Sequence, residues 1–168
     1  MRRGDAWTKA EPISSDDLRA FASSFATGVV VLTTRGRDGS LYGLTMNAVS
    51  CVCLDPPIFL ACVDKNSATL APLLETGAFA LNILARDQET VSNTFASKNP
   101  DKFAGVEHSE GALGVPLIAG ALAAAEFRVV DTVAAGDHVI LLGEALASRR
   151  GEGAPLGYFR GRYADVTP

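Results

Sequence analysis

The sequence predicts a mainly β fold, a closed or split β-barrel with short peripheral helices. Four runs rich in apolar and β-branched residues arrive within about 35 residues and are joined by short turns: 29–34, 41–46, 50–54 and 58–63. Strands spaced this closely pair as an antiparallel sheet or barrel, because a doubly wound fold places helices between successive strands. Closure would remove exposed sheet edges, and small barrels commonly bind one ligand at the mouth.

The composition is that of a globular protein. The chain has 168 residues, of which 48% are apolar and 20% charged, so we expect a single domain over 1–168. The formal net charge of −4 argues against a nucleic acid or an anionic membrane as a partner. Residues 1–13 are expected to form a flexible N-terminal arm.

The sequence does not predict export or membrane insertion. Residues 1–11 are polar and charged and lack the apolar segment of a signal peptide. The longest uncharged run, 111–125, is too short and too rich in glycine and proline to span a bilayer. We therefore expect a cytoplasmic protein without a membrane partner.

The cysteines and histidines do not suggest a metal site. Cys51, Cys53 and Cys62 lie in apolar runs, so small buried side chains are expected there. Cys51-Val-Cys53 does not have the spacing of a redox or zinc pair, and only His108 and His138 could join a metal site. We predict that the protein binds no metal.

The first predicted element is a helix that follows the arm. Ser14 and Asp17 have the spacing of a capping box. The next apolar residues repeat at i, i+3, i+4 and i+7 and predict one helix face: Leu18, Phe21, Ala22 and Phe25. Gly28 is expected to end this helix.

Turn residues separate the strands that follow. Asp38-Gly39 predicts a hairpin turn between the first two strands. Asp55-Pro56-Pro57 separates the third strand from the fourth, because proline has no amide proton for a sheet ladder. Residues 70–76 predict a short helix with Pro72 near its first turn, and a strand is expected at 78–84.

The second half of the chain combines a long loop with a long hairpin. Asp87 is expected to cap a helix that runs to about Ala96. Residues 97–121 predict an irregular loop, of a length that usually serves a function or covers an interface. A hairpin across 132–137 and a last strand are expected from three runs: 122–131, 138–147 and 157–163. The whole prediction is about seven strands and three short helices.

The stretch from Gly43 to Pro57 organises the candidate site. Small and polar residues from Thr45 to Ser50 lie there between two apolar runs. They place a hydroxyl, an amide and exposed backbone groups at the mouth of a β structure, which suits hydrogen bonding to a flat ligand rich in heteroatoms. The same pattern also fits a polar turn between two core strands.

A second candidate is an anion site at the start of the predicted helix 70–76. Lys65 offers a cation, Ser67 and Thr69 offer hydroxyls, and a helix start leaves backbone N–H groups free. The alternative is an ordinary helix cap beside a solvated lysine, since serine and threonine are favoured there in any case.

Two further groups carry polar side chains near strand ends. Gly136-Asp137-His138 could aim an imidazole into a barrel mouth, or it could be a turn with a solvent-facing histidine. Arg160-Gly161-Arg162-Tyr163 could clamp a phosphate or stack on a planar ring, or it could be a basic surface strand.

Common nucleotide and hydrolase motifs are missing from the sequence. It has no GxGxxG after a strand, no GxxxxGKS or GxxxxGKT, no GxSxG and no HExxH. A bound nucleotide would therefore not be held by a Rossmann or P-loop device.

Taken together, these residues resemble the short flavin reductases that serve two-component flavin-dependent monooxygenases. Each motif alone is weak evidence for the resemblance. The specific evidence is that the motifs follow one another in the same order as in the family, from about Leu18 to Tyr163. The matching motifs are Phe25-Ala-Thr-Gly28-Val-Val-Val, Gly43-Leu-Thr-x-Asn47, Leu54-Asp-Pro-Pro57, Asn66-Ser67-x-Thr69, Phe79-Ala-x-Asn82-x-Leu84, Lys102-Phe103-x-Gly105, Gly136-Asp-His138 and Gly161-Arg-Tyr163.

The resemblance implies an FMN-binding split barrel of the Greek-key type that works as a homodimer, with the flavin near the subunit interface. It implies FMN or FAD as the flavin and NADH or NADPH as the co-substrate. The sequence departs from the family at Ala48 and Cys51, where many relatives carry hydroxyls, so individual side-chain contacts there are open.

The resemblance also implies roles for individual residues. The isoalloxazine edge would be lined by Thr45, Met46, Asn47, Ala48 and Ser50. The flavin phosphate would be held by Asn66, Ser67 and Thr69, beside the candidate cation Lys65. The other cofactor-site residues of the matching motifs are Asn82, Lys102 and Phe103. The catalytic group on the nicotinamide side would be His138, Arg162 and Tyr163.

The expected function is that of an NAD(P)H:flavin oxidoreductase, which supplies reduced FMN or FAD to a partner monooxygenase. Hydride transfer between two cofactors needs no nucleophile and no metal from the protein, which has to stack and orient the two rings. His138 would then position the nicotinamide. The alternatives are a split-barrel flavoprotein that retains its FMN and passes electrons onward, and a non-catalytic barrel that binds a ligand or partner.

Overall fold

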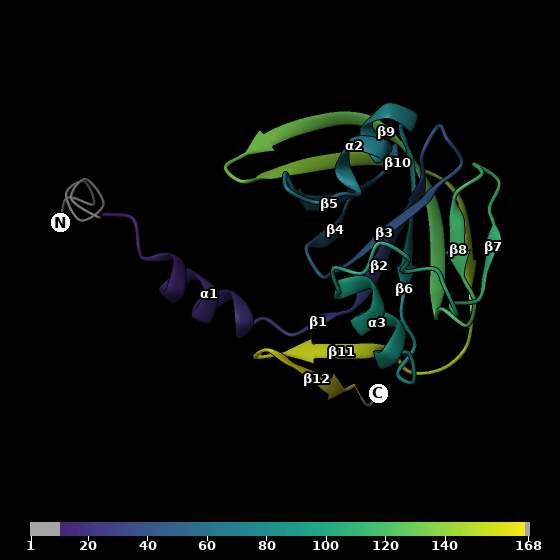
Figure 1. The fold of residues 1–168 in the computed structure, drawn as a ribbon. Helices are drawn as coiled ribbons and strands as arrows, with labels where there is room; N and C mark the ends of the chain where they lie inside the picture. The colour runs from purple at the N-terminus through teal and green to yellow at the C-terminus, as the bar shows by residue number, and fades with distance from the viewer. Residues whose placement is uncertain (1–10, 167–168) are drawn as a thin grey trace.

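The structure is a computed structural model that describes residues 11–166, and it is mainly β (Figure 1). Residues 1–10, most of the expected arm, lie outside the described residues, and residues 11–13 are exposed without regular structure. The described part contains the three expected helices: α1 (Ser15–Ser23), α2 (Leu70–Thr76) and α3 (Glu89–Ala96).

Seven antiparallel strands form the main sheet, in the spatial order β3-β2-β6-β9-β10-β5-β4. They are β2 (Val30–Arg35), β3 (Leu41–Met46), β4 (Val49–Leu54), β5 (Pro57–Asp64), β6 (Ala78–Ile83), β9 (Ala123–Ala135) and β10 (His138–Arg150). The prediction of a mainly β, antiparallel fold is confirmed, and the predicted strand break lies at Asp55-Pro56, since Pro57 is already the first residue of β5 and pairs with Leu54.

The two edge strands of this sheet, β3 and β4, follow one another in the chain. Only Asn47 and Ala48 separate Met46 at the end of β3 from Val49 at the start of β4. Three Cα–Cα steps span at most about 11 Å, so the sheet curls until its edges come close. Within residues 11–166 the two edges do not pair by hydrogen bonds, so the ladder does not form a closed barrel.

Two small sheets complete the β structure. One has the order β1-β11-β12, and the other pairs β7 with β8. Twelve strands are therefore described where about seven were expected, because short strands form inside the predicted loop 97–121 and because 157–163 is a hairpin. Their bounds are β1 (Thr27–Gly28), β7 (His108–Glu110), β8 (Pro116–Ile118), β11 (Leu156–Phe159) and β12 (Arg162–Asp165).

Helix α1 begins as predicted but is shorter than predicted. The Ser14 hydroxyl oxygen accepts a hydrogen bond from the Asp17 backbone N–H at 3.1 Å, which confirms this residue as the cap. The helix ends at Ser23, and Gly28, the predicted end, lies in β1. The apolar residue Phe25 therefore lies beyond the helix.

Two other boundaries also differ from the prediction. Gln88, not Asp87, precedes α3, and its side chain makes no cap hydrogen bond. The long hairpin is confirmed, but its turn is only Gly136-Asp137, because His138 already pairs with Ala135.

The expectation of buried cysteines is wrong. Cys51 is exposed, and Cys53 and Cys62 are half-buried; all three are free thiols. Cys51 and Cys53 lie on β4, which is an edge strand of the sheet, and edge strands keep part of their surface open.

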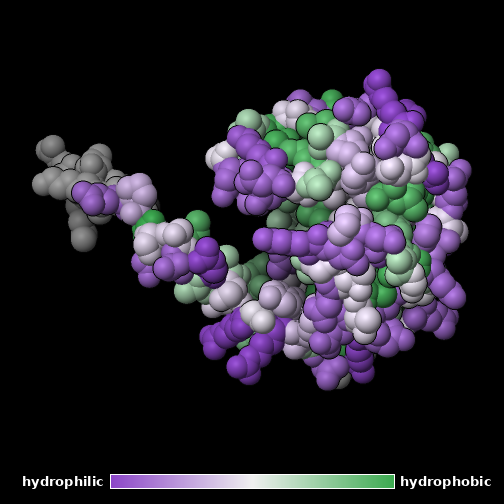
Figure 2. Space-filling view, in the orientation of Figure 1, coloured by the Kyte–Doolittle hydropathy of each residue, from purple (hydrophilic) through white to green (hydrophobic). Residues whose placement is uncertain are grey.

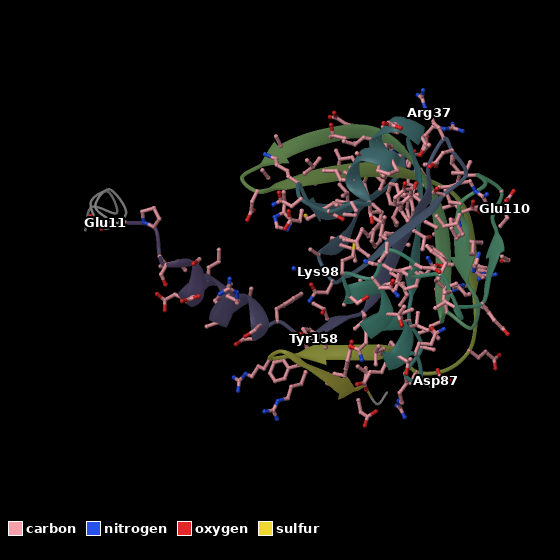
Figure 3. The ribbon with its side chains drawn as sticks, viewed as in Figure 1. Glu11, Arg37, Asp87, Lys98, Glu110 and Tyr158 are labelled. Atoms are coloured by element: carbon pink, nitrogen blue, oxygen red, sulfur yellow. The ribbon has the colours of Figure 1, made fainter. Side chains whose placement is uncertain are left out.

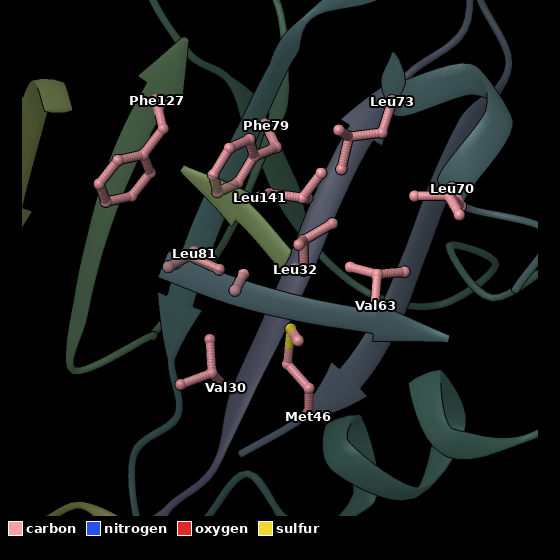
Figure 4. Close-up of a cluster of buried hydrophobic side chains, with 11 residues drawn as sticks. Val30, Leu32, Met46, Val63, Leu70, Leu73, Phe79, Leu81, Phe127 and Leu141 are labelled. Carbon is pink, nitrogen blue, oxygen red and sulfur yellow. The ribbon is translucent and has the colours of Figure 1, made fainter. Parts of the chain in front are cut away.

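Two of the three hydrophobic clusters in the described core lie on opposite faces of β2. Val30 and Leu32 pack into one cluster and Val31 into the other, because neighbouring side chains of a strand point to opposite faces. In the first cluster, side chains from α2 and the surrounding strands converge (Figure 4). It contains the stacked rings of Phe79 and Phe127, with centroids 5.1 Å apart. Burial of β2 on both faces holds the sheet and α3 together.

Helix α3 lies directly on β3 because position 43 has no side chain. Phe95 of α3 is fully buried in the second cluster. A Cβ at Gly43 would lie 2.7 and 2.8 Å from two atoms of the Phe95 ring and 3.0 Å from the Leu32 carbonyl oxygen. Contacts this short do not occur in packed proteins, so a larger residue has to displace α3.

We predict that Gly43→Ala lowers the free energy of unfolding by about 1–3 kcal/mol, the usual range for overpacking a core. The measurement is urea denaturation followed by circular dichroism. Gly28→Ala is the matched control, because a Cβ there meets nothing within 4 Å. It should cost less than about 0.5 kcal/mol. Equal losses in the two variants would show that α3 does not press on position 43.

Candidate functional site

A continuous groove runs along β3, the turn after it and α3. Its largest cavity, of ≈ 680 Å³, lies between β3, the segment 64–69 and the segment 96–102. A second cavity of ≈ 220 Å³ adjoins it at Thr45 and Ala96, and a third of ≈ 550 Å³ adjoins the second at Asn47. We call these three cavities the groove. In Figure 2, a recess opens on the side of the body that faces α1.

The turn between the edge strands forms the middle of the groove, as the sequence predicted for a polar turn at a strand end. The Thr45 hydroxyl donates to the Ser92 carbonyl oxygen of α3 at 2.6 Å, and the Asn47 amide donates to the Thr27 hydroxyl of β1 at 3.2 Å. The Ala48 carbonyl accepts from the Cys62 backbone N–H of β5 at 2.9 Å. Three different elements therefore fix the turn.

A hydroxyl cluster that the sequence analysis did not identify lies beside this turn. The Tyr163 hydroxyl is 2.9 Å from the Ser92 hydroxyl and 2.8 Å from the Asn93 side-chain oxygen. Ser92 is fully buried and lines the second cavity together with Tyr158 and Tyr163. Ser92 and Phe95 are three residues apart and share one helix face. Their spacing in the sequence could therefore have predicted that Ser92 lies on the buried face of α3.

Lys102 provides a partly buried positive charge in the largest cavity. Its ammonium donates to the Phe95 carbonyl at 2.8 Å and to the Gly43 carbonyl at 3.2 Å. An ammonium has three N–H groups, so one stays available for a ligand. Burial lowers the pKa of Lys102, and no carboxylate of the described residues pairs with it. Such a charge favours a bound anion.

The rest of this cavity is mostly polar. A second lysine, Lys98, also lines it, and Figure 3 shows Lys98 extending toward the open side of the molecule. The other polar lining residues are Tyr42, Thr45, Asp64, Asn66, Ser67, Thr69, Ser97 and Asn99. Two cations against one carboxylate make this end of the groove electropositive.

The predicted anion loop is only partly available for a ligand. The backbone N–H groups of Asn66 and Ser67 are bonded to Asp64 at 2.7 and 2.9 Å, and that of Thr69 to the Ser67 hydroxyl at 3.3 Å. Lys65 does not line the cavity, because its ammonium donates to the Gly136 carbonyl at 2.6 Å. The cations that line this cavity are therefore Lys98 and Lys102, and Lys65 lies outside it in the described structure.

The predicted catalytic residues are not brought together within one copy of the chain. His138 lies at the start of β10, with Nδ1 2.8 Å from a carboxylate oxygen of Asp137, and this hydrogen bond lowers the pKa of Asp137. Arg162 is exposed on β12, next to Tyr163. The β9–β10 turn and β12 lie at opposite ends of the body (Figure 1). Among the three, Tyr163 alone lines a described cavity.

Three other predicted residues lie outside the cavities of the groove. Asn82 is fully buried, and its side chain bonds Val31, Thr33 and Ile118, so it ties β6 to β2 and β8 and is not open to a cofactor. Phe103 supports α3 by packing edge-on against Phe95, with ring centroids 4.9 Å apart. Ser50 is exposed on the edge strand β4. Met46, in contrast, lines the second cavity although it is mostly buried.

No helix among the described residues is long and apolar enough to cross a membrane. No group of three or more histidine, cysteine or acidic side chains within the same residues could hold a metal ion.

Comparison with known proteins gives consistent matches over nearly the whole chain. The reductase component of 4-nitrophenol 4-monooxygenase/4-nitrocatechol 2-monooxygenase from Rhodococcus opacus is 37% identical over 158 residues, which cover 94% of this chain and 84% of that protein. The flavin reductase (NADH) of Kitasatospora aureofaciens is 39% identical over 156 residues, covering 90% of this chain and 82% of that one. Two other relatives are longer, and this chain spans 50% and 47% of their lengths.

A solved structure has the same fold. The NADH:FAD oxidoreductase SgcE6 of Streptomyces globisporus C-1027, in complex with NAD and FAD fragments, superposes with a TM-score of 0.87 at 34% identity, covering 95% of this chain and 98% of that one. The family model described as flavin reductase like domain matches residues 22–167. The chain therefore belongs to the flavin reductase-like domain family.

Proposed function

We propose that this protein is an NAD(P)H:flavin oxidoreductase, which passes a hydride from NADH or NADPH to FMN or FAD and supplies the reduced flavin to a separate monooxygenase. The observation that carries the proposal is the groove, in which the hydrogen-bonding turn 45–48 and the partly buried cation Lys102 lie on neighbouring cavities. The names of the relatives, a monooxygenase reductase component and an NADH-dependent flavin reductase, support the same activity.

The groove fits a flavin mononucleotide unit in size and in chemistry. The largest cavity, of ≈ 680 Å³, has the volume typical of small-molecule sites. The Lys102 ammonium, which pairs with no carboxylate of the described residues, suits a phosphate, and Asn66, Ser67 and Thr69 add polar side chains to the same cavity. The hydroxyl, amide and backbone groups of Thr45, Met46, Asn47 and Ala48 suit the polar edge of a flat ring.

A bound flavin supplies the ring that accepts the hydride, so the chain itself has only to bind, orient and polarise. The turn is fixed by α3, β1 and β5, so its donors need not reorganise when charge develops on the ring. Tyr163 and Arg162 would bind the nicotinamide side at the β12 end of the groove. His138 would position the nicotinamide.

We also propose that the curled sheet is the FMN-binding split barrel of the Greek-key type and that the chain works as a homodimer. The two-residue link between the edge strands supports a barrel that comes close to closing without pairing. A dimer would allow His138 of one copy to reach a groove that its own chain leaves open. Three free thiols agree with a reducing, cytoplasmic setting.

The first test is NADH and NADPH oxidation by the purified protein, with and without added FMN, FAD or riboflavin. Turnover should saturate with added flavin, because the flavin acts as an exchanging substrate. A protein that keeps its FMN through purification and gains nothing from added flavin would be an electron carrier. No turnover with any combination would refute the reductase assignment.

Lys102→Met should weaken flavin binding by roughly tenfold to a hundredfold, because a hydrogen bond between charged groups contributes about 1.5–3 kcal/mol. Affinity is measured by quenching of flavin fluorescence. Arg37→Met removes an exposed cation that donates to the Glu75 carbonyl, outside the groove, and serves as the control. Riboflavin, which lacks the phosphate, should bind both variants like the wild type.

Binding of FMN should also depend on pH through Lys102. Burial lowers the pKa of this ammonium, so its charge is lost as the pH rises through that lowered value, and affinity should fall there. The measurement is an FMN titration across the alkaline range. The Lys102→Met variant should lack this step, and an identical pH profile in both proteins would contradict the role of Lys102.

His138→Ala should raise the apparent KM for the nicotinamide or slow the hydride transfer, because the imidazole would no longer position the ring. Steady-state and stopped-flow kinetics separate these two effects. FMN affinity should stay unchanged, since His138 would contact the nicotinamide and does not line the groove of its own chain. Unchanged kinetics would remove His138 from the site.

A further inference from the structure

Helix α1 has an apolar face that its own chain does not cover. None of its residues is buried, and the side chains of Leu18 and Phe21 are 55% and 77% exposed. Figure 1 shows the helix held away from the body. A helix of nine residues is too short to be stable alone in water. It therefore needs a surface to pack on.

The helix is not placed to fold back onto its own body. Only three residues separate the end of α1 at Ser23 from the start of β1 at Thr27. The Ser23 carbonyl also accepts a hydrogen bond from the Arg160 backbone N–H at 2.9 Å, which fixes this end of the helix to the β11–β12 turn. The exposed face of α1 thus points to another molecule.

The same chain has an uncovered apolar cavity of ≈ 300 Å³ between β4, β5, β6, β9 and the end of β10. Its wall includes Leu54, which is 85% exposed, together with Ile83, Phe59 and the two thiols Cys51 and Cys53. We call it the apolar cavity. It shares Val30, Val49 and Ile83 with the third cavity of the groove, so the two openings are continuous.

The charges around these two apolar surfaces are complementary. Arg149 and Arg150 line the apolar cavity, and no carboxylate does. Helix α1 carries Asp16 and Asp17 in its first turn, and since Asp16 is paired with Arg19 of the same helix at 2.6 Å, Asp17 supplies the remaining negative charge. Opposite charges at the rim of an apolar contact favour one orientation of the partners.

We propose that two copies of the chain exchange their α1 helices, so that the apolar face of each α1 fills the apolar cavity of the other copy and closes one end of its groove. One chain carries both surfaces, so a two-fold dimer uses each of them once per copy and leaves none exposed. The proposal rests on the homodimer proposed above and adds the helix that completes the neighbouring site.

Cross-linking tests the contact directly. In the full-length Phe21→Cys variant, mild oxidation should join position 21 to Cys51 or Cys53 of the other copy and give a covalent dimer on a non-reducing gel. Ala20→Cys, on the opposite face of α1, should not cross-link beyond the wild-type background. Adding Cys51→Ser and Cys53→Ser to the Phe21→Cys variant should abolish the cross-link.

Three cross-linking results would contradict the exchange of α1 helices. A link within one chain, or a dimer that persists without Cys51 and Cys53, would overturn the exchange. Equal cross-linking of the Phe21→Cys and Ala20→Cys variants would do the same.

Sedimentation equilibrium gives an independent measurement. Phe21→Asp should raise the dimer dissociation constant by at least about a hundredfold, because each of two arms loses a buried ring and gains a desolvated carboxylate. Ala20→Asp adds the same charge on the other face and should leave the dimer intact. Equal dissociation constants would overturn the exchange.

The failure of this inference is distinguishable from failure of the proposed function. A dimeric wild type without the cross-link would refute the arm exchange alone. A monomeric wild type would refute both the homodimer and the exchange. NADH oxidation with added flavin tests the reductase activity in either case.

Discussion

The two-residue link between β3 and β4 is the constraint on which the rest of the structure depends. These strands are the outer edges of the seven-stranded sheet, and Asn47 and Ala48 are all that separates them. The sheet has to curl for its edges to lie so close. The curl places the link at the mouth of the β structure, where the Asn47 amide, the backbone of the link and the neighbouring Thr45 hydroxyl line a groove and not a flat sheet face.

Helix α3 completes the groove through one close contact. Its Phe95 lies on Gly43, and the same approach brings the Phe95 and Gly43 carbonyls to the ammonium of Lys102. Core packing and ligand binding are therefore coupled at this point. The helix also presents Ser92 to both Thr45 and Tyr163, so one element connects the turn, the cation and the small C-terminal sheet.

The proposed hydride transfer accounts for a site built from hydrogen-bond donors and a cation. When two cofactors carry the reaction, the protein contributes binding and orientation, and fixed dipoles serve this task better than titrating groups. The groove of one copy holds Tyr163 but not His138, and its apolar end continues into a cavity that the chain leaves uncovered. Both features agree with the proposed homodimer, in which a second copy would complete the site.

The sequence by itself determined the seven strands of the main sheet and the turn residues between them, because strand periodicity and the backbone preferences of glycine and proline act locally. The motifs that resemble the family also named Thr45, Asn47 and Lys102, and the structure places these three residues on the cavities of one groove. The sequence could not assign Asn82 to the core or Lys65 to the hairpin turn, since both depend on which strands become neighbours. Only the tertiary structure decided that Ser92 joins the groove and that α1 and β4 stay open, because burial is set by contacts between segments far apart in the chain.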